Sequence, residues 1–340
     1  MSNTDQQLTD WHARALALES GVNSVIVGQA AAIRMITVAM FARGHVLLEG
    51  DVGVGKTTLL RACAQAIGGA YARVEGSIDL MPGDLVYYTY LNEQGSPRVD
   101  PGPLLQHGEG LATFFFNEIN RARPQVHALL LRVMAERSVQ AFNREYRLPH
   151  IQVFADRNQL EKEETFELPS AARDRFLMEL SIRLPSDREI QRDLLTNPRY
   201  HDTDKLLATL SGDVLPFDGL NDIAGLIQQS VQSTQTLQDY VLNLCQATRT
   251  PSAFGIAMSG VEADHLIQAG VSPRGMSLLL RAARVVAWLQ GREHLLPEDV
   301  RAVFRETVAH RVFLKPIYEM QRDSLMPEFI EQLLQQVSTP

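Results

Sequence analysis

Residues 45–57 read HVLLEGDVGVGKT, and this stretch decides the fold of the chain. The first five residues, 45–49, form an apolar run typical of a short buried strand. The next eight, 50–57, fit the pattern G-x-x-x-x-G-K-S/T at every defined position. Residues 56–67 then have the composition of a helix, which is expected to end at the glycine pair 68–69. A strand, a glycine loop and a helix in this order predict a phosphate-binding loop.

The glycine loop predicts a site for a nucleoside triphosphate, with ATP and Mg²⁺ as the cofactors. Glycines allow successive backbone N–H groups to turn inward around phosphates. Lys56 is expected to neutralise the β- and γ-phosphates, and Thr57 to bind Mg²⁺. A chance glycine turn is the alternative, which the flanking strand and helix disfavour. The predicted nucleotide-binding residues are Gly50, Asp51, Val52, Gly53, Val54, Gly55, Lys56, Thr57 and Thr58.

Further buried strands are expected at 111–116, 151–155 and 177–184, with helices between them. Strands that alternate with helices predict a mostly parallel sheet flanked by helices. We therefore predict an α/β domain over residues 1–190, with a hairpin-bearing insert at 77–105. Residues 191–215 are expected to be a linker, and 216–340 a helical domain.

The composition sets limits on the class of protein. With 45% apolar and 21% charged residues, the chain has the composition of a globular domain. Its net charge of −8 disfavours a general nucleic-acid binder, whose affinity comes mostly from neutralising phosphates. No apolar run reaches the roughly 20 residues needed to cross a bilayer, and the polar start of the chain has no signal-peptide pattern. We expect no membrane span and a cytoplasmic location.

A second nucleotide motif is expected where the strand 111–116 ends, at Asn117-Glu118. Phosphate-loop ATPases usually have Asp followed by Glu here, to hold the Mg²⁺ shell and to polarise the attacking water. Glu118 is our candidate general base, and an ordinary strand-end carboxylate is the alternative. Asn117 is the candidate metal-shell residue, with an oxygen atom but no charge.

The missing charge at Asn117 leads to a hypothesis about rate. One unit charge a few Å from a cation is worth on the order of 1–4 kcal/mol at intermediate dielectric. Mg²⁺ affinity is therefore expected to be weakened and ATP turnover to be slow, while nucleotide binding is kept. On this hypothesis, Asn117→Asp raises the Mg²⁺-dependent rate.

These motifs resemble those of the MoxR family of AAA+ ATPases, and the likeness spans nearly the whole chain. The string N-E-I-N-R-A at 117–122 is close to the D-E-I-N-R-A of that family. The other segments that carry the resemblance are 44–50, 168–169, 174–176 and 272–274. The resemblance implies a parallel five-stranded AAA+ sheet flanked by helices, a second, all-helical lid domain, and a hexameric ring with ATP between neighbouring subunits.

The resemblance also implies roles for residues outside the phosphate loop. Asn158 matches the polar sensor of the attacking water, although the family commonly reads T-Q-N where this chain has Asp156-Arg157-Asn158. Arg175 matches the arginine finger that reaches the neighbour's γ-phosphate, with Arg173 as its rival. Further matches are Arg274 to a second phosphate sensor, and Gly28 and Gln29 to the segment that packs on adenine.

Two expected hairpins, within 77–105 and 138–148, resemble pore-facing inserts of this clade. Tyr87, Tyr88 and Tyr90 could then grip a client chain; half-buried strand residues are the alternative reading. The family resemblance implies a chaperone-like ATPase that remodels a client protein, often during maturation of a metallo-enzyme. It also implies a separate partner with a von Willebrand factor A domain.

Two other functional classes stay open at this point. In a nucleotide-gated scaffold, ATP binding switches assembly and Asn117 has reduced hydrolysis. In a nucleic-acid motor, ATP hydrolysis would drive movement along a strand. The acidic charge opposes the motor, and no aromatic-plus-arginine stretch suggests a strand channel.

Overall fold

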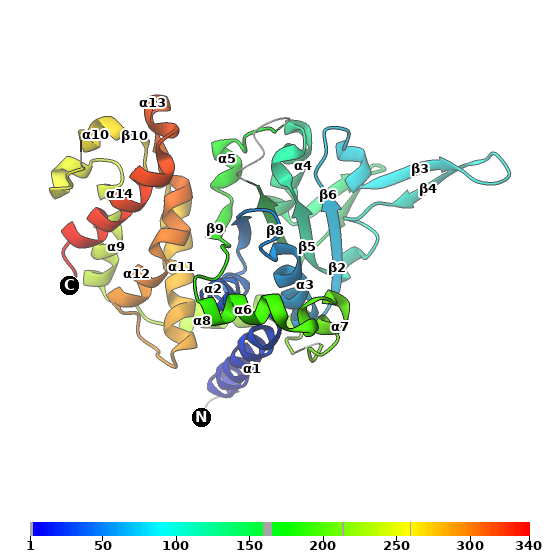
Figure 1. Ribbon diagram of the computed structural model, residues 1–340, viewed down its shortest axis with the longest axis horizontal. Coiled ribbons are helices and arrows are strands. Elements are labelled where there is room, and N and C mark those ends of the chain that lie inside the picture. The colour runs from blue at the N-terminus through cyan, green and yellow to red at the C-terminus, as the bar shows by residue number, and fades with distance from the viewer. Residues whose placement is uncertain (1–2, 159–164, 213, 259) are drawn as a thin grey trace.

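The computed structural model describes residues 3–158, 165–212, 214–258 and 260–340. An α/β part carries the sheet, and a helical part formed by residues 220–340 lies beside it (Figure 1). The predicted fold class is therefore confirmed: a parallel five-stranded sheet flanked by helices, followed by a helical domain. A short two-stranded pairing inside the helical part is the one β element there among the named strands.

The central sheet has the strand order β2-β5-β8-β1-β9, and every pairing in it is parallel. β1 lies between β8 and β9, so the strand that leads into the glycine loop is an inner one. Three of the four strands expected from apolar runs match within two residues, and the fourth, β9, ends three residues early. The strands are β1 His45–Glu49, β2 Ala70–Glu75, β5 Leu111–Asn117, β8 Gln152–Arg157 and β9 Phe176–Ser181.

The sequence patterns alone missed β2 at the edge of the sheet. Its residues alternate between polar and apolar, and its burial alternates with them because only one face is covered. Arg73 and Glu75 point outward and form an ion pair of 3.5 Å. An edge strand needs no continuous apolar run, so apolar runs could not reveal it.

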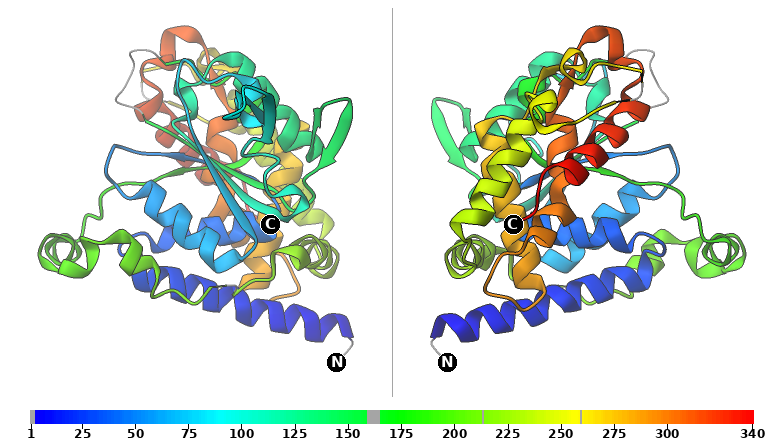
Figure 2. Two further views of the ribbon diagram at one scale, coloured as in Figure 1. Left: turned by 90° about the vertical axis from the view of Figure 1, so that its right-hand side faces the viewer. Right: turned by 90° about the vertical axis from the view of Figure 1, so that its left-hand side faces the viewer.

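Helices cover both faces of the sheet and form two apolar cores. On one face, α2 Ala30–Phe41 and α3 Lys56–Ile67 pack with α1 Asn3–Val25 and the helical part. On the other face, α4 Pro124–Glu136 and the short α5 Ser170–Arg173 cover the second core. Figure 2 shows α1 running along one edge of the molecule.

The two expected hairpins are present. One is β3 Tyr87–Leu91 with β4 Pro97–Pro101, and it extends away from the sheet in Figure 1; the other is β6 Ser138–Ala141 with β7 Arg144–Arg147. Tyr87, Tyr88 and Tyr90 are 37%, 47% and 47% exposed, and every residue of β3 is exposed, so the alternation of the half-buried alternative is not found. The ring of Tyr87 contacts that of Phe142, in the turn of the second hairpin, at a centroid distance of 4.9 Å.

The remaining elements are mostly helices, and two of them lie within or next to the expected linker, residues 191–215. The helices are α6 Arg188–Thr196, α7 Thr203–Leu207, α8 Leu220–Ser230, α9 Gln235–Ala247, α10 Ala263–Leu266, α11 Pro273–Leu289, α12 Pro297–Val308, α13 Pro316–Glu319 and α14 Arg322–Gln336. The two short strands are β10 Ile267–Ala269 and β11 Phe313–Leu314. Seven 3₁₀ turns complete the described elements, at Pro82–Leu85, Gly108–Gly110, Ile119–Arg121, Pro198–Tyr200, Phe217–Gly219, Pro251–Phe254 and Ala309–Arg311.

Aromatic contacts join the helical part to the α/β part. Phe41, at the end of α2, lies between Trp11 of α1 and Trp288 of α11, at ring distances of 6.2 and 4.8 Å. The core on this face therefore continues from the sheet into the helical part. Within the described ranges, no helix has both the length and the apolar composition needed to span a membrane.

His45, at the start of β1, is a buried neutral base at the centre of the fold. Its Nδ1 accepts the N–H of Val153 at 2.9 Å, which leaves Nε2 to donate to the carbonyl of Met134 at 3.2 Å. Burial lowers the pKa of His45 to about 3, and the bond to Met134 only partly opposes this shift. The imidazole therefore stays neutral in the folded protein well below its usual pKa of about 6.5.

His45 should therefore contribute to acid sensitivity. Because its pKa is lowered, His45 becomes protonated near pH 6.5 in the unfolded chain but only near pH 3 in the folded protein. Stability is present above the unfolded pKa and is lost as the pH falls below it. Between about pH 7 and pH 5, we expect the free energy of unfolding of His45→Gln to fall by about 2 kcal/mol less than that of the wild type. Urea unfolding at both pH values measures this difference; the exposed His107→Gln is the control, and an equal loss in His45→Gln would contradict the assignment.

Candidate functional site

The glycine loop lies between β1 and α3, where the sequence predicted it. Gly53 and Gly55 have φ angles of +81° and +88°, which glycine adopts without the strain that a side chain would add. Gly50 is needed for another reason: a Cβ there would lie 2.2 Å from the carbonyl oxygen of Ile182. The loop therefore begins in close contact with the chain that leaves β9.

Lys56 is buried at the start of α3 and faces back into the loop. Its ammonium donates to the carbonyl oxygens of Gly50 at 2.5 Å and Asp51 at 3.2 Å. Thr57 and Thr58 follow in the first turn of α3 and are half-buried. The unpaired N–H groups and the positive dipole end of a helix favour an anion at this position. Lysine, hydroxyls and helix end together form a site suited to phosphates.

The second motif follows β5, as predicted. Asn117 is buried, and Glu118 has φ +52° and ψ +51°, a left-handed conformation that is uncommon for residues other than glycine. The N–H of Glu118 donates to Oδ1 of Asp156 at 2.5 Å, and its carboxylate pairs with Arg121 at 3.0 Å. Strained backbone of this kind is typical of functional sites.

Asp156 is a buried carboxylate in β8 to which the sequence reasoning assigned no role. Besides Glu118, it faces Lys56, whose Nζ lies 3.7 Å from its Oδ2. Burial raises the pKa of Asp156, against the opposing effects of the Glu118 N–H and the Lys56 ammonium. Asn158 is buried two residues further on, and its carbonyl accepts from Asn120 at 3.5 Å. The departure from T-Q-N at 156–158 was the signal that could have identified Asp156.

Gly28 and Gln29 lie at the same end of the sheet as the phosphate loop. The side chain of Gln29 donates to the carbonyl of Arg183 at 2.7 Å, one residue beyond the Ile182 that touches the loop. Gly28 has φ +73°, and a Cβ there would lie 2.3 Å from Pro185. The segment expected to contact adenine therefore packs beside the predicted phosphate site.

The two candidate arginine fingers differ in what surrounds them. Arg173 is buried, lies 4.0 Å from Glu179, and covers the ring of Phe313 at 5.7 Å, so it joins the α/β part to the helical part. Arg175 is half-buried and bonds through one guanidinium nitrogen to the carbonyl of Ala171 at 2.9 Å. Its Nε is buried without a hydrogen-bond partner. Arg173 has two such atoms, Nε and Nη2. The difference between the two arginines is therefore their burial, and Arg175 is the less buried one.

Arg274, the expected second sensor, lies at the start of α11 and is 52% exposed. Its Nη1 is 3.4 Å from Asp174, which also accepts a hydrogen bond of 2.8 Å from Ser272 and pairs with the buried Arg311 at 3.2 Å. Arg311 is a structural residue that the sequence reasoning missed. Arg274 therefore lies beside Asp174 and Arg175 at the start of β9.

The parallel pairing of β1 with β9 separates two groups of predicted residues. Glu49, just before the loop, pairs with Ser181, while His45 pairs with Phe176, just after Arg175. Four residue steps along a strand span roughly 13 Å. Arg175 and Arg274 therefore lie at the opposite end of the sheet from the phosphate loop of their own chain. The structure brings Lys56, Thr57, Asn117, Glu118 and Asn158 together at the other end.

The residues at the carboxyl ends of the strands fit the chemistry of Mg²⁺. Among the described residues, no group of three or more His, Cys, Asp or Glu side chains could form a metal site alone. Mg²⁺ bound with a nucleotide needs only one or two protein oxygen ligands, because phosphates and water supply the rest. Thr57, Asn117 and Asp156 offer such oxygens.

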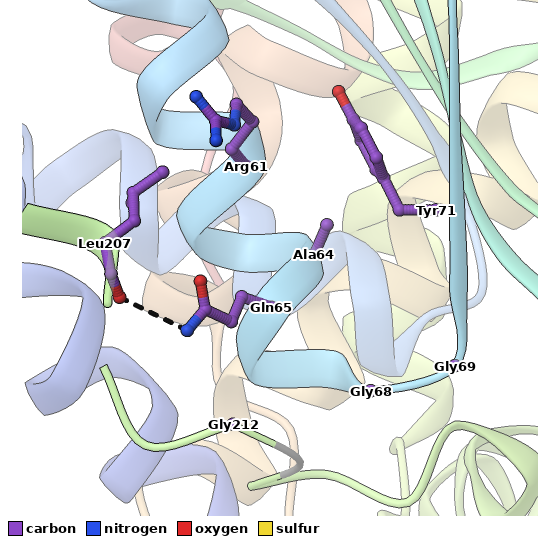
Figure 3. Close-up of a pocket in the computed structure, with 8 residues that line it drawn as sticks. All are labelled: Arg61, Ala64, Gln65, Gly68, Gly69, Tyr71, Leu207 and Gly212. Carbon is purple, nitrogen blue, oxygen red and sulfur yellow. Dashed lines mark hydrogen bonds between the residues drawn. The ribbon is translucent and has the colours of Figure 1, made fainter. Parts of the chain in front are cut away.

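A cavity of about 330 Å³ lies elsewhere, at the far end of α3 from the phosphate loop (Figure 3). Arg61, Gln65 and Tyr71 line it, and Gln65 donates to the carbonyl of Leu207 at 3.2 Å across it. It contains none of the predicted site residues.

A phosphate loop on an inner strand of a parallel five-stranded sheet, followed by a helical domain, defines an ATPase of the AAA class. The family described as "ATPase family associated with various cellular activities (AAA)" matches residues 45–178, and "AAA lid domain" matches 262–335. The solved structure of a putative ATPase from Cytophaga hutchinsonii superposes with a TM-score of 0.84 at 26% identity, covering 99% of this chain and 98% of that one.

Relatives identify the family within this class. Protein MoxR of Methylorubrum extorquens is 57% identical over 99% of this chain and 98% of its own length, and Protein MoxR of Paracoccus denitrificans is 55% identical over 99% of each. Chaperone MoxR1 of Mycobacterium tuberculosis is 35% identical over 94% of this chain and 80% of its own. The chain therefore belongs to the MoxR family of AAA+ ATPases, and membership supports ATP hydrolase activity in general.

Proposed function

We propose that this protein binds ATP with Mg²⁺ at residues 50–58 and hydrolyses it between the subunits of a homo-hexameric ring, to remodel a client protein in the cytoplasm. The observation that carries the proposal is the separation of the site into two halves. Lys56 and Glu118 lie at one end of the sheet, while Arg175 lies at the other. An arginine there is too far from its own phosphate loop and is well placed to serve a neighbour's.

In this proposal, residues of one subunit bind and orient the triphosphate. The loop amides and Lys56 hold the phosphates, and Gly28 and Gln29 pack on the adenine side. Mg²⁺, when bound, neutralises phosphate charge and polarises the transferred group. Glu118 accepts a proton from the attacking water, and Asn158 helps to orient that water. The ion pair with Arg121, at 3.0 Å, helps to fix the direction of the Glu118 carboxylate.

The neighbouring subunit completes the site. Arg175 stabilises charge that develops on the γ-phosphate, an effect worth orders of magnitude in rate for arginine fingers. Arg274 lies beside it and adds a second cation to the same face. Head-to-tail contacts of this kind close into rings. This arrangement supports a ring, and the number of six subunits is what the family resemblance implies.

Remodelling of a client is supported by the exposed aromatic hairpin and by the relative named as a chaperone. Tyr87, Tyr88 and Tyr90 present rings to solvent on a hairpin that extends from the sheet (Figure 1). Maturation of a metallo-enzyme, and a partner with a von Willebrand factor A domain, extend the proposal by family resemblance. A nucleic-acid client is disfavoured by the net charge of −8.

The scaffold alternative is tested by Glu118→Gln. If Glu118 is the general base, its loss should lower steady-state ATP turnover roughly 100-fold. Binding of a fluorescent ADP should stay unchanged, because Glu118 is not among the residues that hold phosphate. Wild-type turnover no faster than that of Glu118→Gln would instead favour a nucleotide-gated scaffold.

The shared site is tested by mixing two inactive variants. Lys56→Ala should lose its own nucleotide but keep the arginine, and Arg175→Ala should do the reverse. Random co-assembly at equal amounts should restore about a quarter of the wild-type ATPase rate, because half of the subunits supply each half-site in a head-to-tail ring. No recovery on mixing would place Arg175 outside the neighbour's site, and Arg173→Ala in the same mixture tests its rival.

The client grip is tested on the hairpin. Casein, which has no stable fold, should stimulate the ATPase, and Tyr87→Ala with Tyr88→Ala should abolish this stimulation while leaving the basal rate intact. Val99→Ala on the partner strand β4 is the control, since Val99 is 49% exposed but not aromatic. Stimulation that survives in the tyrosine variant would remove the grip from the proposal.

A further inference from the structure

Asp156 occupies a position for which the proposed chemistry has a use. It belongs to β8, the strand between β1 and β5, so it lies between the phosphate loop and the second motif. Its side chain is only 4% exposed. A buried carboxylate is costly unless cations or hydrogen-bond donors surround it, so a residue retained here calls for an explanation.

Strand alternation places Asp156 and Asn117 on the same face of the sheet. Phe116 pairs with Ala155, and one step further along each strand come Asn117 and Asp156. Successive side chains alternate between faces, so both lie on the face of Phe115 and Phe154, whose core includes residues of α3. This is the face that carries Lys56 and Thr57.

The contacts of Asp156 leave it able to do more than neutralise Lys56. Its Oδ2 lies 3.7 Å from Nζ, which is longer than a direct charged hydrogen bond. The two nearer acceptors of Lys56 are backbone carbonyls, those of Gly50 and Asp51. A carboxylate has about four acceptor positions, and the Glu118 N–H takes one of them.

The negative charge that Asn117 lacks is therefore present at Asp156, on the neighbouring strand. The pattern of phosphate-loop ATPases has Asp where this chain has Asn117, and the related T-Q-N string has an uncharged residue where this chain has Asp156. The pair keeps one carboxylate and one neutral side chain, but exchanges their strands. The pair therefore still offers one carboxylate to the predicted Mg²⁺ position.

We propose that Asp156 supplies the carboxylate of the Mg²⁺ shell that Asn117 lacks, either directly or through a metal-bound water. Mg²⁺ prefers carboxylate oxygens and keeps several waters, so a carboxylate one strand away from the usual one can serve. This inference rests on the proposed ATP site. It also changes what is expected of Asn117, because the weakened Mg²⁺ affinity inferred from that residue alone is compensated.

A competing role for Asp156, as a counter-ion of Lys56, would change the nucleotide affinity in the opposite direction. If Asp156 were only a counter-ion of Lys56, it would compete with phosphates for the ammonium. Removing its charge would then tighten nucleotide binding whether or not Mg²⁺ is present. A metal-shell residue, by contrast, affects only the part of the affinity that depends on the metal.

The test is a cycle of three variants: Asp156→Asn, Asn117→Asp, and both together. Asparagine at 156 keeps an oxygen that can accept the Glu118 N–H, and the double variant restores one carboxylate if a single variant folds poorly. Fluorescent ADP is titrated onto each full-length variant in EDTA and in excess Mg²⁺. Mn²⁺ bound to each ADP complex is measured by electron paramagnetic resonance. Both readouts are independent of turnover.

We expect Asp156→Asn to reduce the Mg²⁺ enhancement of ADP affinity roughly tenfold and to leave the affinity in EDTA unchanged. Asn117→Asp should restore the enhancement in the Asp156→Asn background and add much less to the wild type, since interacting residues are non-additive. Tighter binding of Asp156→Asn in both buffers, or no change in either, would overturn the inference. Wild-type protein that bound no ADP in either buffer would overturn the ATP site itself.

Discussion

The parallel pairing of β1 with β8 on one side and β9 on the other is the constraint on which the site depends. It brings the loop after β1 next to the polar residues that end β8, and it places Arg175 at the other end of β9. The charged groups that we propose to act on a phosphate are therefore divided between two ends of the sheet in one subunit. In that proposal, two copies of the chain form a complete site.

The conformation of the glycine loop could be predicted because it depends on residues that are consecutive in the sequence. Gly53, Gly55 and Lys56 serve a short backbone turn, and their spacing alone indicates it. The buried strands followed from apolar runs for the same reason. The start of α11 is set locally as well, since the hydroxyl of Ser272 caps the N–H of Gly275 at 3.0 Å.

What the sequence could not supply are features set by partners far along the chain. β2 is recognisable as a strand only through its pairing with β5. The place of Arg274 depends on Asp174, a hundred residues away. The role proposed for Asp156 depends on a strand register that places it beside Asn117 and within reach of Lys56. In each case the residue type was visible but its neighbours were not.

The segment that carries Arg175 is also fastened to the helical part of its own subunit. Asp174 pairs with Arg311, and the guanidinium of Arg173 covers the ring of Phe313. The two residues at the end of α5, just before Arg175, therefore both contact the helical part. A tilt of the helical part would therefore move Arg175 with it. In a closed ring, the orientation of the helical part in one subunit would then set the distance between its Arg175 and the nucleotide of the next subunit. Such mechanical coupling would set the order in which the subunits hydrolyse ATP.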